Sequence, residues 1–357
     1  MKKICLNMIV KNESDIIEKT LKNIVQKIPI DYWVICDTGS TDSTPTIIES
    51  FFRDLGIEGE MHHDRWVDFS HNRNLALERA KTKAEYIFIF DADDSIVGNP
   101  TIPTIMDSDY YFFNFRTYMR PLMVKSSVSC SWHGVLHEYL SYSGESRHNV
   151  DGDYYVVSGR TGSRNKNPNK YLHDAKVLEK AYYSDLKKEN SMSPRYSFYC
   201  AQSYKDCNRK KDAIKWYLNT VKLNGWIEER YYSYYQAGLL CLETGQVEKA
   251  IYCFLGGQGI YNQRSECYYM LAKYYREKKN YSLGYLFAKE GKNITRPIDG
   301  LFVIEDVYRY LLDYEISICA YYCDKKEEGK NACQKVLENC GDENILNTTK
   351  NNLKYYE

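Results

Sequence analysis

The sequence predicts an α/β domain with a mainly parallel sheet, followed by an all-α domain of repeated helices. Short apolar runs alternate with helical patterns over the first hundred residues. Beyond about residue 169, apolar residues recur at helical spacing and strand-like runs almost disappear. A length of 357 residues also exceeds what one hydrophobic core usually holds. We therefore expect two domains, 1–168 and 169–357.

The alternation in the first domain can be followed element by element. Apolar runs predict strands at 4–10, 32–36, 58–62 and 86–90. Helical patterns predict helices at 13–27, from 43 onward and at 70–83. Such a series gives parallel strands with helices on both faces of the sheet. Ligands bind these sheets beyond the carboxyl ends of the strands, where Asp37 and Asp91 lie.

Composition and charge argue against several classes of protein. Lys and Arg number 48, as do Asp and Glu, so the overall charge predicts no nucleic-acid partner. The first residues lack the apolar core of a signal peptide, and no apolar run reaches the length of a membrane span. The twelve cysteines are scattered singly, without a CxxC pair. These features predict a cytoplasmic protein with reduced thiols.

The stretch CDTGSTDST, residues 36–44, follows the second predicted strand. Gly39 permits a tight turn, and the hydroxyl residues with Pro45 suit a helix start. An ordinary capped turn explains these residues but not an acid at the edge of a crevice. We expect Asp37 to be an exposed carboxylate that can accept hydrogen bonds from a base or a sugar hydroxyl. Both interpretations remain open.

A second acidic cluster ends the strand in YIFIFDADDS, residues 86–95. Asp91 and Asp93 are two positions apart, so their side chains can converge, and the small Ala92 between them permits close approach. Paired carboxylates favour Mg²⁺ or Mn²⁺, with water and phosphate oxygens as the other ligands. The alternative is a solvated acidic loop.

Four motifs in order, MIVKNES, ICDTGSTDST, HNRNLALERA and IFIFDADD, resemble the nucleotide-sugar-binding half of a family 2 glycosyltransferase with the GT-A fold. The resemblance spans about residues 3–98. It implies metal-dependent, inverting transfer from a nucleoside diphosphate sugar, most commonly a uridine diphosphate sugar. Asp91, Ala92 and Asp93 match the family's DxD motif. Asp93 would then be a direct metal ligand, and Asp91 would lie near the ribose and a metal-bound water.

The same resemblance implies further donor-binding residues. Asp37 would hold the base or the ribose. Arg73 matches a position near the donor, where a guanidinium suits diphosphate or sugar oxygens. Asn12 and Glu13 match the segment after the first strand and belong to the same donor site.

The segment SWHGVLHEYL, residues 131–140, resembles the W-x-G-x-x-H-E stretch of soluble members of this family. By this resemblance His137 is a candidate third metal ligand and Trp132 a platform for a sugar face. Glu138 is the candidate general base, with Asp151 and Asp153 as rivals. An ordinary packed strand is the alternative for this segment.

The segment SGRTGSRNKNPNKY, residues 158–171, combines glycine, serine, asparagine and basic residues. It reads as a loop that ends where Pro168 opens a helix. Arg160, Arg164 and Lys166 can close over a diphosphate and neutralise the leaving group. A solvated linker is an equal alternative.

In the second domain, small residues recur in pairs twelve positions apart. The pairs are Ala201 with Ala213, Gly238 with Ala250, Ala272 with Gly284 and Ala320 with Ala332. This pattern resembles tetratricopeptide repeats, with an insertion at 293–306, although a non-repeating helical domain is the alternative. Such a domain can hold an acceptor glycan or protein, a protein partner or a second copy of the chain.

Two other functions compete with the transferase. IFIFDADDS also resembles the D-x-D-x-S/T motif of haloacid-dehalogenase-type phosphohydrolases, in which Asp91 would be a nucleophile. That interpretation leaves DTGSTDST unexplained, and the motif normally follows the first strand. The second alternative is a helical-repeat scaffold with a degenerate transferase domain.

Overall fold

The structure is a computed structural model that describes residues 2–188, 191–298 and 300–356. The chain divides into two compact units, Met1–Val177 and Leu178–Glu357. The division falls within helix α4 (Lys170–Asp185), which continues from the first unit into the second. The domain boundary at 168/169 stays a prediction.

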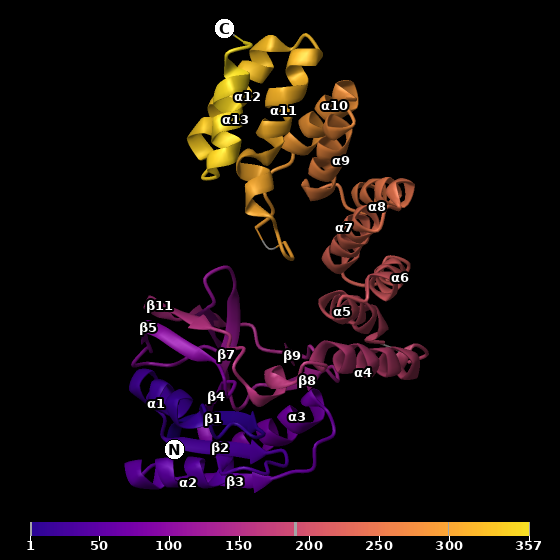
Figure 1. The fold of residues 1–357 in the computed structure, drawn as a ribbon. Helices are drawn as coiled ribbons and strands as arrows, with labels where there is room; N and C mark the ends of the chain where they lie inside the picture. Colours follow the sequence, from indigo (N-terminus) through magenta and orange to yellow (C-terminus); the bar gives the residue numbers. More distant parts are fainter. Residues whose placement is uncertain (1, 189–190, 299, 357) are drawn as a thin grey trace. The chain divides into compact units, whose positions relative to one another are not determined.

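A seven-stranded sheet forms the centre of the first unit, in the order β10-β6-β7-β4-β1-β2-β3 (Figure 1). The strands are β1 (Lys2–Val10), β2 (Tyr32–Asp37), β3 (Gly59–His63), β4 (Ala84–Ile89), β6 (Tyr110–Asn114), β7 (Met119–Lys125) and β10 (Arg147–Asn149). Strands β1 to β4 are parallel, whereas β7 is antiparallel to β4 and β6. The predicted mainly parallel sheet is confirmed.

Helices cover both faces of this sheet. Successive side chains of each strand point to opposite faces, so alternate residues belong to two different hydrophobic cores. In β1, Leu6 belongs to the core that includes α1 (Ile17–Lys27) and α2 (Thr44–Leu55). Its neighbour Cys5 belongs to the core that includes α3 (Phe69–Ala80). The three predicted helices of this domain are therefore confirmed, one on one face and two on the other.

Two small two-stranded sheets complete the first unit, and their strands, like β6, β7 and β10 of the central sheet, were not predicted. In one, β8 (Cys130–His133) pairs with β9 (Tyr139–Tyr142) and packs Trp132 into the α3 core. In the other, β5 (Ser95–Thr101) pairs antiparallel with β11 (Asp151–Val157). Since Val157 lies opposite Ser95, the chain after β11 returns to the acidic residues that precede β5.

The second unit consists of antiparallel helix pairs that follow one another along the chain (Figure 1). They are α5 (Ser193–Asp206) with α6 (Lys210–Thr220), α7 (Ile227–Glu243) with α8 (Val247–Ile260), α9 (Glu266–Glu277) with α10 (Tyr281–Lys292), and α11 (Leu312–Tyr322) with α12 (Lys326–Asn339), before the final α13 (Glu343–Leu353). Each predicted pair of small residues places one buried residue on each helix of a pair. A Cβ at Gly238 would overlap the ring of Phe254 on the partner helix. The repeat of helix pairs is confirmed.

The predicted insertion lies between α10 and α11 and is held by a buried ion cluster. Arg264, only 1% exposed, pairs with Glu228 and, at 2.6 Å, with Glu266. Its Nη1 also donates to the carbonyl of Leu301, whose own amide donates to Glu228 at 2.9 Å. The insertion is therefore fastened to both α7 and the start of α9.

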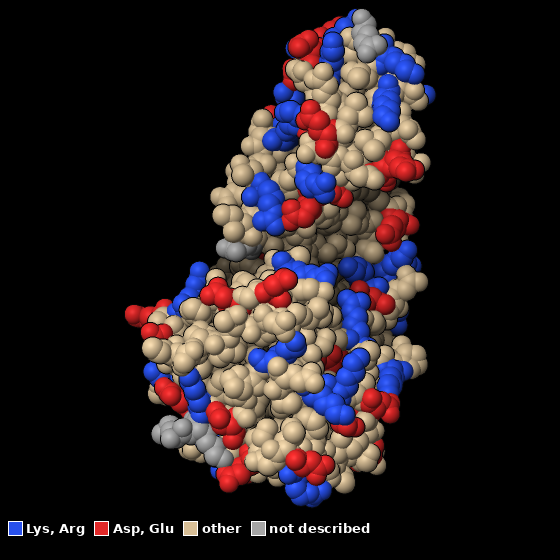
Figure 2. Space-filling view, turned by 90° about the vertical axis from the view of Figure 1, so that its left-hand side faces the viewer, with Lys and Arg blue, Asp and Glu red and all other residues tan. Residues whose placement is uncertain are grey.

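Charges of both signs are interspersed over the face shown in Figure 2, in keeping with the formal net charge of zero. All twelve cysteines are free, and nine of them are buried. Within the described residues, every helix is too short or too polar to cross a membrane.

Candidate functional site

Two cavities lie beyond the carboxyl ends of β1 and β4. The larger cavity, of about 1030 Å³, is bordered by the segments that follow these strands and by residues 158–177. The smaller cavity, of about 500 Å³, is bordered by β7 and by the β8–β9 hairpin. The two cavities share six lining residues, namely Phe69, Arg73, Asp91, Leu136, His137 and Arg164. A reacting group at this shared wall is accessible from both cavities.

The predicted acidic pair lines the larger cavity, but the two carboxylates have different partners. Asp91 accepts a 2.6 Å hydrogen bond from Arg73 and lies 4.0 Å from the Arg120 guanidinium. Burial opposes ionisation of Asp91, but these two cations hold its pKa below the ordinary value. Asp93 accepts from the amide of Gly162 at 3.3 Å. Ala92 is buried between them, and its carbonyl accepts from Thr20.

The segment 158–166 meets this acidic cluster with backbone amides. Ser163 donates its amide to Glu13 at 3.1 Å, and Gly159 donates to Asp94 at 2.9 Å. Burial and the nearby charge of Asp91 raise the pKa of Asp94 to about 7. Burial also raises the pKa of Glu13. Burial disfavours the ionised form of these acids, and the backbone amides stabilise that form by donating hydrogen bonds to it.

The three basic side chains of this segment do not converge on the acids. Arg160 is exposed on the border of the larger cavity. Arg164 borders both cavities but pairs with Asp174, and its guanidinium lies 5.0 Å from the centre of the Phe69 ring. Lys166 pairs with Asp15 at 2.6 Å and borders neither cavity. A clamp by Arg160 and Arg164 over a diphosphate stays a prediction.

Gly159 permits the close approach of this segment, because a Cβ there would overlap the carbonyl oxygen of Asp93. Gly159→Ala is therefore expected to lower the free energy of unfolding by about 1–3 kcal/mol through overpacking. Urea denaturation measures this change. The matched control is Gly341→Ala, where a Cβ would meet no atom within 4 Å. Equal stability of the two variants would contradict the close packing.

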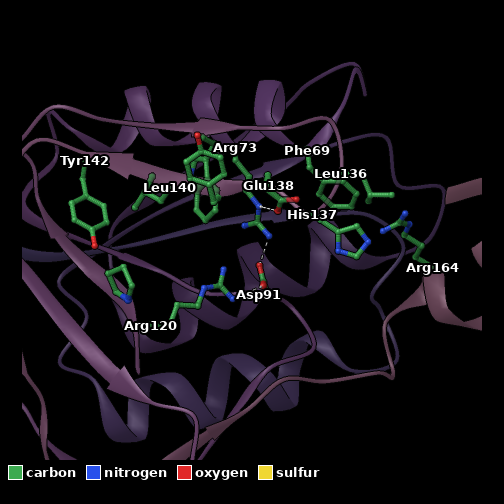
Figure 3. Close-up of a pocket in the computed structure, with 13 residues that line it drawn as sticks. Phe69, Arg73, Asp91, Arg120, Leu136, His137, Glu138, Leu140, Tyr142 and Arg164 are labelled. Atoms are coloured by element: carbon green, nitrogen blue, oxygen red, sulfur yellow. Dashed lines mark hydrogen bonds and ion pairs between the residues drawn. The ribbon is translucent and has the colours of Figure 1, made fainter. Parts of the chain in front are cut away.

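Arg73 links the acidic loop to the β8–β9 hairpin (Figure 3). It is 7% exposed and donates from Nε to Glu138 at 2.7 Å and from Nη2 to Asp91. Its guanidinium also lies 4.9 Å from the centre of the Trp132 ring. Arg73 thus orients the candidate base, while its expected contact with donor oxygens stays a prediction. Trp132 is only 5% exposed, so its ring forms a wall behind Arg73 rather than an open platform.

Asp37 differs from the expected exposed carboxylate. It is buried, and its side chain accepts from the amides of Gly39 and Ser40 at 3.3 and 3.1 Å. The neighbouring Thr38 borders the larger cavity, whereas Asp37 borders neither cavity. The expectation of exposure was wrong because the tight turn folds its amides back onto the carboxylate. Asn12 borders the larger cavity and supports the same turn by accepting from the amide of Thr41 at 2.7 Å.

His137 borders both cavities, as Asp91 does. Among the described residues, no three His, Cys, Asp or Glu side chains are grouped closely enough to hold a metal ion. The predicted set of Asp91, Asp93 and His137 is therefore not assembled as a protein cage. The carboxylates of Asp93 and Glu13 nevertheless border one cavity and supply hard oxygen ligands. This donor set fits Mg²⁺ or Mn²⁺, which commonly takes one or two carboxylates and completes its shell with phosphate and water.

Sequence reasoning missed two charged residues of the site. Asp94 lies in the stretch YIFIFDADDS, and it is buried. The cluster of three acidic residues in this stretch is the only signal in the sequence that points to it. Nothing in the sequence around Arg120 points to the site. Arg120 lies near Asp91 because β7 pairs antiparallel with β4. The rival bases Asp151 and Asp153 are exposed on β11 and border neither cavity.

The sheet order defines an α/β domain with an acid-lined cavity beyond the carboxyl ends of its strands, joined to an all-α domain of TPR-like helical repeats. Residues 5–108 match the profile described as Glycosyl transferase family 2. This span holds β1 to β4 and the acidic loop. Residues 5–108 therefore form a family 2 glycosyltransferase domain.

Several known proteins are similar to parts of the chain. A TPR repeat-containing protein of Synechococcus elongatus is 32% identical over 97 residues, which span 27% of this chain and 22% of that protein. The structure of S. aureus TarS 1–349 in complex with UDP-GlcNAc has 12% identity and a TM-score of 0.36, covering 73% of this chain and 93% of TarS. YrrB, a TPR protein with an unusual peptide-binding site, has 14% identity and a TM-score of 0.38, covering 51% and 88%.

Proposed function

We propose that this protein is a metal-dependent, inverting glycosyltransferase that moves a sugar from a nucleoside diphosphate sugar to an acceptor hydroxyl. The observation that carries the proposal is the pair of cavities with a shared wall at Arg73, Asp91 and His137. The larger cavity carries the acids that suit a metal and a diphosphate, and the smaller carries Glu138. Two substrates can therefore meet where their cavities join.

The donor is assigned to the larger cavity. Asp93 and Glu13 would hold Mn²⁺ or Mg²⁺, which would supply charge neutralisation for the diphosphate. Exposed cations at the border of this cavity, Lys11 and Arg160, add positive charge on the protein side. The preference for a uridine diphosphate sugar rests on the resemblance to family 2 alone.

Transfer begins when Glu138 accepts the proton of the acceptor hydroxyl. The hydroxyl oxygen forms a bond to the anomeric carbon as the bond from that carbon to the diphosphate oxygen breaks. The electron pair of the broken bond leaves with the diphosphate. Attack from the smaller cavity, opposite the diphosphate, inverts the configuration at the anomeric carbon. Arg73 holds Glu138 in place through its 2.7 Å hydrogen bond.

Asp93→Asn is expected to weaken the metal-dependent part of donor binding by about tenfold or more. Replacing a residue that only hydrogen-bonds to a metal ligand typically lowers metal affinity or activity by about 10–100-fold, so replacing a ligand should have at least this effect. The amide oxygen can still accept from Gly162, so the fold should persist. Isothermal titration of uridine diphosphate with and without Mn²⁺ measures the effect. Asp54→Asn, an exposed change on α2, is the control. Unaltered metal-dependent binding would remove Asp93 from the metal site.

The helical domain is proposed to bind a protein partner or an acceptor, as helical-repeat surfaces commonly do. A cytoplasmic location is likewise a proposal from the scattered cysteines. The scaffold alternative predicts no donor binding in the titration above. The phosphohydrolase alternative is disfavoured because its motif follows β4 here, whereas that class carries it after the first strand.

A further inference from the structure

The smaller cavity has a wall of aromatic and apolar side chains on the hairpin. Leu140 and Tyr142 lie on β9, two positions apart, so they share one face of the hairpin. The Tyr142 ring packs against Tyr110, with the ring centres 4.3 Å apart. Tyr142 nevertheless remains 42% exposed. It therefore offers a fixed aromatic surface at the border of the cavity.

Arg120 is a polar residue that borders the same cavity as this apolar wall. Its guanidinium lies 4.0 Å from Asp91, and its side chain is 31% exposed. Within the described chain, no acceptor atom takes a hydrogen bond from this guanidinium. In Figure 3, Arg120 and Tyr142 lie on one side of the cavity and His137 on the other, with Asp91 and Glu138 between them. The donors of Arg120 are thus available to a ligand beside the candidate base.

We propose that the smaller cavity binds the terminal sugar of a carbohydrate acceptor, with Tyr142 and Arg120 as the residues that determine specificity. This inference rests on the proposed transferase function. A sugar ring has an apolar C–H face that suits Tyr142 and hydroxyl oxygens that suit the guanidinium of Arg120. A volume of about 500 Å³ lies within the usual range for small-ligand sites, roughly 300–1,000 Å³.

The position of Glu138 completes the site. It borders the smaller cavity but not the larger one, so its carboxylate faces the acceptor and not the donor. A hydroxyl of the bound sugar gives its proton to Glu138 and its oxygen to the anomeric carbon, and the diphosphate leaves with the electron pair. An extended peptide is usually recognised by a long groove or a free sheet edge along several residues. A compact cavity that combines an aromatic ring with one guanidinium is better matched to a sugar.

The test uses the full-length protein with Mn²⁺ and a panel of uridine diphosphate sugars. Donor binding is measured first by isothermal titration, because its absence in the unmodified protein refutes the transferase function itself. Transfer is then followed by mass spectrometry to two panels, one of mono- and disaccharides and one of serine- and threonine-containing peptides. We expect saccharide products. Tyr142→Ala and Arg120→Gln should each raise the KM for the saccharide about tenfold or more, with a smaller change in kcat and similar donor affinity.

The control is Tyr118→Ala, which removes an exposed tyrosine that borders neither cavity. Its KM and kcat should equal those of the unmodified protein. A protein that binds donor but glycosylates only peptides, or no saccharide in the panel, would overturn the carbohydrate assignment. An unchanged saccharide KM in both cavity variants would also overturn the roles of Tyr142 and Arg120.

Discussion

Glu138→Gln is expected to lower kcat by about a hundredfold or more, because loss of a general base typically has an effect of 10²–10⁴-fold. Glutamine keeps the shape of the side chain and one oxygen that can accept from Arg73. It cannot take the proton of the acceptor hydroxyl. Donor affinity should change little, since Glu138 does not border the larger cavity. Steady-state kinetics at saturating donor and acceptor measure kcat.

The controls are Asp151→Asn and Asp153→Asn, which alter the rival bases on β11. Both aspartates are exposed and lie outside the two cavities, so each variant should retain normal turnover. Near-normal kcat in Glu138→Gln would refute the assigned base. A large loss in one aspartate variant would transfer the role to that residue.

Arg264→Met is expected to lower the free energy of unfolding of the helical domain by about 3–5 kcal/mol. The substitution leaves Glu228 and Glu266 buried without their shared cation. Two uncompensated buried carboxylates are far more costly than the loss of packing from one side chain. Urea denaturation followed by far-ultraviolet circular dichroism measures the change.

Arg209→Met is the matched control, because its pair with Asp212 is largely exposed. It should change stability by no more than about 1 kcal/mol. Adding Glu228→Gln and Glu266→Gln to Arg264→Met should recover part of the lost stability, since neutral amides remove the buried charges. A loss in Arg264→Met no greater than in the control would show that the cluster does not hold the insertion.

Local patterns were sufficient to predict strands β1 to β4, helices α1 to α3, the helix pairs of the second domain and the acidic loop, but not the strands from β5 onward. The run before Asp91 could be read directly because a buried strand needs consecutive apolar residues. The small residues of the helical domain were equally informative. Gly238 and Ala250 each allow one helix to approach its partner, so the constraint is visible at every repeat.

Contacts between distant segments could not be predicted in the same way. Arg73 and Glu138 are 65 positions apart, and their hydrogen bond depends on how the β8–β9 hairpin packs on α3. Arg120 depends on the registration of β7 beside β4. The burial of Asp37 depends on the path of its own turn, which composition alone does not determine. The contacts of Arg73 and Arg120 are thus set by tertiary packing, whereas the burial of Asp37 is set by the conformation of its own turn.

The insertion between α10 and α11, which is bound to α7 and α9, affects how the helical domain unfolds. In a simple array, each helix pair contacts only its neighbours and can fray from an end one pair at a time. Here Leu301 is bound to Glu228 of α7, and the amide of Ile304 donates to Glu266 of α9 at 3.3 Å. A segment late in the chain thereby ties earlier pairs together. The pairs α7–α8 and α9–α10 are therefore expected to open together, because opening either one breaks hydrogen bonds to the insertion.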